Sequence, residues 1–77
     1  MDLSKLEINQ KAILTGINGL KNTKRRFRSF GLDIGSKIQI KQKSITNSNI
    51  EILSEHGLIA LRENEAKMLS CELLAEK

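Results

Sequence analysis

The chain has 77 residues, with 13 Lys and Arg against 9 Asp and Glu, no Pro, one Cys and two aromatic residues. A chain of this length forms one domain with a small core, which leaves little room for an elaborate buried active site. The lone Cys71 excludes an internal disulfide and a zinc cage of thiolates, and no apolar run approaches the roughly 20 residues that span a bilayer. The start of the chain also lacks the basic head and apolar run of a signal peptide. We therefore expect one soluble, cytoplasmic domain over residues 1–77.

The positive charge is local. The net charge is +4, and one segment carries five cations and no anion, so the remainder carries −1. These cations are Lys21, Lys24, Arg25, Arg26 and Arg28. One cluster on a near-neutral body indicates either a single docking spot or an ordinary solvated helix face, because a general nucleic-acid binder more often has a basic stripe over several elements.

The first expected element is a strand over residues 12–17, whose apolar side chains occupy both faces and predict that it is covered on both sides. A helix of about two turns follows over residues 23–30, with Leu20, Lys24, Phe27 and Phe30 at intervals of three and four. Asn22 or Thr23 can cap its start, and Gly31 stands where a helix stop is expected.

Period-two alternation predicts further strands at residues 37–41 and 50–52, joined by the polar loop 44–49. A continuous apolar run at 58–61 predicts the fourth strand, and residues 63–66 resemble a helical turn. The last strand, residues 69–73, should bury Leu69, Cys71 and Leu73. About five short strands in so short a chain predict a mainly β protein, a small bent sheet that closes on itself as a barrel and so removes its exposed edges.

Catalytic and metal sites are poorly supported. Cys71 is at an inward strand position, where a free Cys usually acts as a small hydrophobe, and His56 is beside Gly57 in an expected exposed turn. Glu55 and His56 supply an oxygen and a nitrogen side by side, but no third ligand is visible nearby. We expect that the protein is not an enzyme, binds no cofactor and has no preformed metal site. Glu55 and His56 are weak candidates for ligands of ferrous iron or another divalent metal.

The cationic segment is the remaining candidate site. If the cations lie in the first turns of the helix, they oppose its macrodipole at about 0.3–1 kcal/mol each. One explanation is a partner that supplies carboxylates or phosphates, which makes Lys24, Arg25, Arg26 and Arg28 candidate contact residues. The other is that solvent screens the charges and the stems of Lys24 and Arg28 merely shield the core; this is the more common outcome for exposed charges.

Several motifs run along nearly the whole chain: Leu3-Ser4 with Leu6, the strand Lys11–Ile17, Arg25-Arg26 with Phe30-Gly31-Leu32 and Gly35, the alternating Ile38 and Ile40, and Gly57 with Ala60-Leu61-Arg62 and Ala66. As a set rather than singly, they resemble the FeoA family, the small cytosolic component of bacterial ferrous iron transport. The departures are Asn9 where the family usually has Gly, Ile34 where Pro is common, and a 44–49 loop without prolines.

The resemblance implies an SH3-like barrel, also similar to the C-terminal domain of DtxR-type repressors. It implies a non-enzymatic accessory role beside FeoB, the membrane transporter with a cytosolic G-domain. The protein would be cytoplasmic, at the inner face of the membrane only through this partner, and a monomer or weak homo-oligomer. Two alternatives stay open. One is a small nucleic-acid or ribosome-associated barrel, although a chain with only two aromatic residues offers few rings for base stacking. The other is direct metal sensing through Glu55 and His56.

Overall fold

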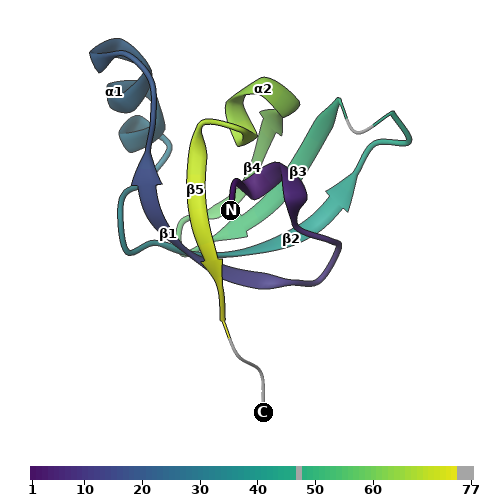
Figure 1. Cartoon of the computed structure of the whole chain (residues 1–77). Coiled ribbons are helices and arrows are strands. Elements are labelled where there is room, and N and C mark those ends of the chain that lie inside the picture. The colour runs from purple at the N-terminus through teal and green to yellow at the C-terminus, as the bar shows by residue number, and fades with distance from the viewer. Residues whose placement is uncertain (47, 75–77) are drawn as a thin grey trace.

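The computed structural model describes residues 1–46 and 48–74 and contains five strands, two α-helices and a 3-10 helix. In chain order these are η1 (Leu3–Lys5), β1 (Lys11–Ile17), α1 (Lys21–Ser29), β2 (Lys37–Lys43), β3 (Asn49–Ser54), β4 (Gly57–Arg62), α2 (Glu63–Ala66) and β5 (Leu69–Leu73). Figure 1 shows the strands curling around a common interior, with α1 at one corner and α2 across one end. The mainly β prediction, with one helix after the first strand and a helical turn before the last, is confirmed.

All neighbouring strands are antiparallel, in the order β4-β3-β2-β1-β5. The register shifts between Leu14 and Gly16 where β1 meets β5, and between Ile40 and Gln42 where β2 meets β3. An extra residue in one strand bends it and increases its twist. These two irregularities explain how so short a sheet curls into a barrel.

The two outer strands, β4 and β5, form no pair with each other over the described residues. Each is protected in a different way. The chain start covers β5: the Cys71 amide donates to the Met1 carbonyl at 2.8 Å, and Asp2 forms a bridge with Ser70. On the other side α2 carries the chain from the end of β4 to β5. The opening is thus spanned by a helix and by the N-terminal segment, where we expected hydrogen bonds between strands.

The core lies inside the curled sheet and consists almost entirely of aliphatic side chains. Its fully buried members are Leu3, Leu6, Ala12, Leu14, Phe27, Leu32, Ile38, Ile40, Ile50, Ile52, Leu61, Ala66, Leu69 and Cys71. Leu3 belongs to η1 and Leu6 directly follows it; this short helix packs against α2 and β5 and was not predicted as an element. The side chain of Asp2 caps η1 by accepting from the Ser4 amide at 2.9 Å.

Two burial predictions were wrong. Strand β1 is not covered on both sides, because Thr15 is exposed and Ile13 only half-buried. Leu73 does not share the burial of Cys71 but stays 45% exposed, because it ends β5 beside a hollow in the surface. Asn9 is in the left-handed region at φ 74°, which Asn tolerates better than most residues, so this position does not require Gly.

Candidate functional site

Helix α1 begins earlier than predicted and without a side-chain cap. Its N-cap is Leu20, so Lys21 is the first helical residue and neither Asn22 nor Thr23 has the predicted capping role. Leu20 is 80% exposed and does not belong to the buried face. The apolar attachment of the helix is therefore limited to Phe27, which is buried, and Phe30, which is half-buried.

The end of α1 is as predicted. Gly31 has φ 86°, its amide donates to the Arg28 carbonyl at 2.9 Å, and the Leu32 amide donates to the Phe27 carbonyl at 3.0 Å. This pair of hydrogen bonds is a Schellman motif, which favours Gly at the left-handed position. Leu32 and Phe27 are both in the core, as the motif's apolar contact requires.

Because α1 starts earlier than predicted, part of the cationic cluster lies at the other end of the helix dipole than expected. Arg26 and Arg28 lie in the last turn, at the negative end of the helix dipole, where a cation is favourable. Only Lys21 stands at the very start, where it opposes the dipole. The arginines lie one to two turns beyond the N-terminal amides, so the amides and the arginines do not form one anion-attracting surface.

Arg26 is engaged within the molecule. Its guanidinium lies 3.0 Å from Glu65 Oε2 of α2, and the Glu65 side chain is only 12% exposed. The same guanidinium lies 5.4 Å from the centre of the Phe30 ring, within cation–π range. Arg26 therefore links α1 to α2, while its side chain stays 62% exposed, and a role in binding a partner stays a prediction.

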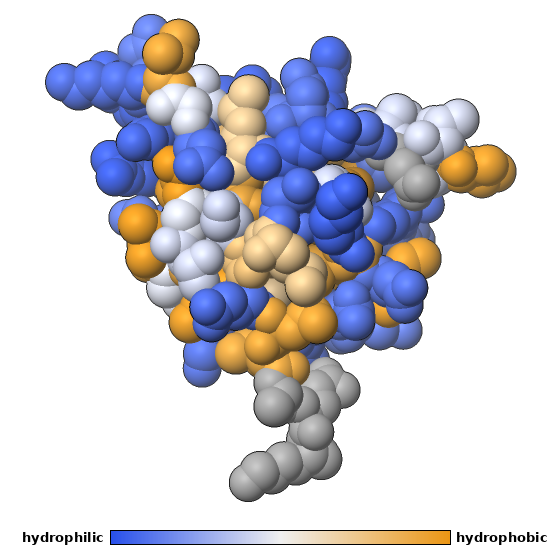
Figure 2. Space-filling view, viewed as in Figure 1, coloured by the Kyte–Doolittle hydropathy of each residue, from blue (hydrophilic) through white to orange (hydrophobic). Residues whose placement is uncertain are grey.

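Arg28 approaches Asp33 at 3.7 Å, with both side chains about 60% exposed, so this pair contributes little. Lys21, Lys24 and Arg25 form no ion pair over the described residues. Figure 2 shows hydrophilic side chains gathered over the α1 corner. Lys21, Lys24 and Arg25 are thus available to a partner. Arg28 is held only by its weak, exposed pair with Asp33.

Glu55 and His56 form the tight turn between β3 and β4, and both are exposed. The hydroxyl of Ser54 shapes this turn by accepting from the His56 amide at 3.1 Å and donating to the Gly57 carbonyl at 3.0 Å. No group of three potential metal ligands occurs within residues 1–46 and 48–74. Metal binding by these two residues stays a prediction.

The ring of His56 lies against the end of α1. A Cβ built on Gly31 would overlap Cδ2 of that ring, so the two residues are in direct contact. Sequence reasoning missed this contact because it joins residues 25 positions apart and leaves no periodic signal. Cys71, in contrast, is buried as predicted, and this burial raises the pKa of its thiol, which makes it a poor nucleophile.

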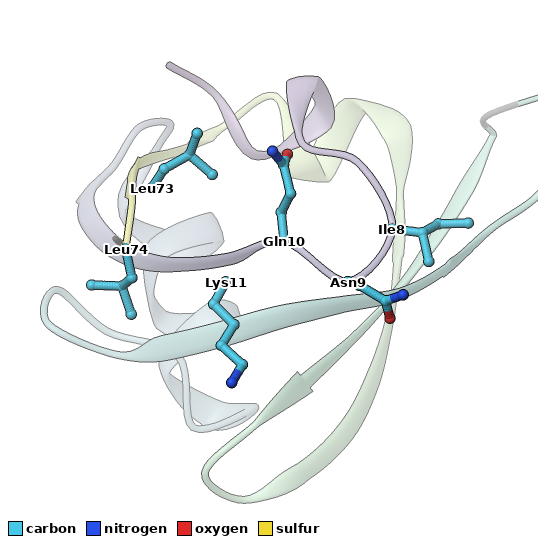
Figure 3. A pocket seen from close by; sticks show the side chains of 6 residues that line it. All are labelled: Ile8, Asn9, Gln10, Lys11, Leu73 and Leu74. Carbon is cyan, nitrogen blue, oxygen red and sulfur yellow. The ribbon is translucent and has the colours of Figure 1, made fainter. Parts of the chain in front are cut away.

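The surface has two adjoining hollows beside Lys11 and Leu74. One, of about 410 Å³, is lined by Ile8, Asn9, Gln10, Lys11, Leu73 and Leu74 (Figure 3). The other, of about 220 Å³, is mostly apolar and reaches Ile38 and Leu53. The described residues that line the first hollow include no His, Cys, Asp or Glu. Sequence reasoning did not find it, because Ile8 precedes the first expected strand.

Membrane insertion through a helix finds no support: over the described residues no helix has the length and apolar character to cross a bilayer.

Comparison with known proteins agrees with this architecture. The model of the FeoA domain family matches residues 1–73. A Campylobacter jejuni protein, provisionally named Fe(2+) transport protein A, is 31% identical over 74 residues, which are 96% of this chain and all of that one.

Two solved structures extend the comparison. The FeoA protein of Chlorobium tepidum superposes with a TM-score of 0.90 at 28% identity, over 97% of this chain and 71% of that one. FeoA of Stenotrophomonas maltophilia, described as an SH3 domain protein complexed with zinc, shares the fold with a TM-score of 0.81 at 24% identity, over 94% and 89% of the two chains. The barrel is therefore SH3-like, and this chain belongs to the FeoA family of ferrous iron transport proteins.

Proposed function

We propose that this protein is a non-enzymatic accessory protein of bacterial ferrous iron uptake. It acts in the cytoplasm by binding the cytosolic part of a FeoB transporter and reaches the inner face of the membrane through that partner. The family supports the link to ferrous iron transport. The observation that carries the binding mode is the cationic surface of α1, where Lys21, Lys24 and Arg25 have no internal ion pair over the described residues.

The partner surface should be acidic. The cations of this helix, of which Lys21 and Arg25 are exposed and Lys24 is half-buried, attract a patch of carboxylates. Such attraction mainly raises the rate of association and weakens with salt. The remainder of this chain has a net charge of −1, so the attraction comes from one corner and orients the encounter. Arg26, whose side chain is 62% exposed, contributes less to this attraction because Glu65 already neutralises its guanidinium.

The test is a titration of the purified protein against the purified cytosolic part of the transporter, with fluorescence or calorimetry as the readout. The double variant Lys24→Glu with Arg25→Glu should weaken binding by about ten-fold or more, because charge reversal replaces attraction with repulsion. The control is Lys41→Glu with Lys37→Glu, which makes the same change in net charge at two exposed positions of β2.

An equal loss of affinity in both variants would mean that net charge alone causes the effect. Unchanged affinity in the α1 variant would contradict docking through α1. A raised salt concentration should weaken the wild-type complex and change the reversed variant little.

The nucleic-acid alternative receives no support from the aromatic residues. Base stacking needs exposed rings, but Phe27 is fully buried and Phe30 is half-buried beneath Arg26. A salt-dependent gel shift of single-stranded RNA at micromolar protein would favour this alternative over transporter binding.

A further inference from the structure

Helix α1 has an unusually small apolar attachment for an element that carries the candidate contact surface. Phe27 is the only one of its nine residues that is buried. Its first turn has no side-chain cap, and Leu20 before it is 80% exposed. Most helices in proteins are stabilised by packing of an apolar face, so other contacts must hold this one in position.

The first such contact is the carboxylate of Glu65, which serves two elements at once. Oε2 lies 3.0 Å from the Arg26 guanidinium of α1, and Oε1 accepts from the Arg62 amide at 3.1 Å, where β4 gives way to α2. A carboxylate that is only 12% exposed needs partners to offset its desolvation. Arg26 is the cationic partner that it has.

The second contact is the His56 ring against the Gly31 backbone. His56 directly precedes β4, whereas Arg62 ends it. The two contacts therefore come from the turn before β4 and from the helix after it, and they reach α1 at Arg26 and at Gly31, two residues beyond the last helical residue Ser29. Lys21, Lys24 and Arg25 precede these two contacts, in the part of the helix that follows β1 and the Asn18 amide, which donates to the Met68 carbonyl at 2.7 Å.

We propose that α1 is an arm held by a two-point attachment, Arg26 on Glu65 and Gly31 on His56, and that this attachment sets the direction of its free cations. Arg26 and His56 are then positioning residues, not contact residues. The effect on partner binding rests on the proposed function, but the attachment itself does not, since it can be measured on the protein alone.

The test is hydrogen exchange of α1 amides, in particular Gly31 and Leu32, whose hydrogen bonds to Arg28 and Phe27 close the helix. Arg26→Gln should speed their exchange by about five-fold, because losing a contact with a largely buried carboxylate lowers the cost of local opening. Glu65→Gln should do the same while its amide oxygen still accepts from Arg62. Arg28→Gln removes the exposed pair with Asp33 and serves as the matched control, with little change expected.

The double variant Arg26→Gln with Glu65→Gln should exchange no faster than either single variant, because both remove one interaction. His56→Ala should add its own acceleration to Arg26→Gln, because it removes the other point. Unchanged amide protection in β2 and β3 in the same spectra shows that each variant remains folded.

Equal protection in wild type, Arg26→Gln and Glu65→Gln would overturn the proposal, and so would an equal acceleration in Arg28→Gln. If α1 loosens in Arg26→Gln but affinity for the transporter's cytosolic part stays the same, the attachment stands and docking through α1 fails. If α1 loosens and affinity falls, both stand.

Discussion

The curled sheet and α1 are held in place by different kinds of contact. The sheet carries the bulk of the core, in which eight of its side chains are buried aliphatic residues: Ala12, Leu14, Ile38, Ile40, Ile50, Ile52, Leu61 and Leu69. Helix α1 contributes Phe27 alone and relies on an ion pair and a ring contact for the rest. Apolar burial is strong and insensitive to salt, whereas an ion pair can be changed without disturbing the core. The element that carries the free cations is thus the one that a mutation can loosen separately.

Phe27 is the point where the two regions meet, and its removal should have the largest effect. Phe27→Ala should cost about 3–5 kcal/mol in the free energy of unfolding, as much as the whole net stability of a domain this small. Denaturant titration followed by circular dichroism should show little folded protein. Phe30→Ala is the control, with a clearly smaller loss, because that ring is only half-buried. A loss below about 1 kcal/mol for Phe27→Ala would contradict the view that this side chain is the apolar anchor of α1.

The ring contact can be isolated by comparing two glycines. Gly31 and Gly35 have similar conformations, with φ 86° and 93°, but a Cβ would overlap His56 at the first and meets nothing within 4 Å at the second. Gly35→Ala should cost about 1 kcal/mol for the left-handed backbone alone. Gly31→Ala should cost about 1–3 kcal/mol more, the usual range for overpacking.

The double variant Gly31→Ala with His56→Ala tests the cause of that difference. It should recover most of the extra loss, because the smaller side chain leaves room for the new methyl group. Equal melting of the Gly31→Ala and Gly35→Ala variants would mean that His56 moves aside at no cost, and the contact would then not restrain α1.

The sheet has a pH dependence of its own through Cys71. Burial raises the pKa of this thiol in the folded state above its ordinary value of 9.0, so folding favours the protonated form. Its contribution to stability is therefore complete below that unfolded pKa and is lost as the pH rises through the folded pKa. As the pH rises above 9.0, the free energy of unfolding should fall by up to about 1.4 kcal/mol per pH unit. Cys71→Ala should remove this slope, and an identical slope in both proteins would contradict the assignment.

The two regions also differ in how far they could be predicted from the sequence. Alternation located the strands, and the residues of α2 were predicted as the structure has them, because Glu63 and Glu65 follow a strand end and favour a first helical turn. The start of α1 was wrong because the available caps, Asn22 and Thr23, are not used. Arg26 with Glu65 and Gly31 with His56 join residues far apart in the chain, and no local pattern encodes such pairs. Local physics therefore located the elements, while the attachment of the arm required the tertiary structure.

The smallest effect should come from supplying the cap that α1 lacks. Leu20 occupies the N-cap in an extended conformation, φ −75° and ψ 165°, which suits a capping Ser, and its side chain is 80% exposed. Leu20→Ser should therefore stabilise the first turn by about 0.5–1 kcal/mol without any loss in the core. Exchange at the amides of Asn22 and Thr23 should slow, while protection in the sheet stays the same. Leu20→Ala removes the apolar side chain without adding a cap and should not slow exchange. A similar gain in both variants would show that the exposed leucine itself, rather than the missing hydrogen bond, destabilises the start of the arm.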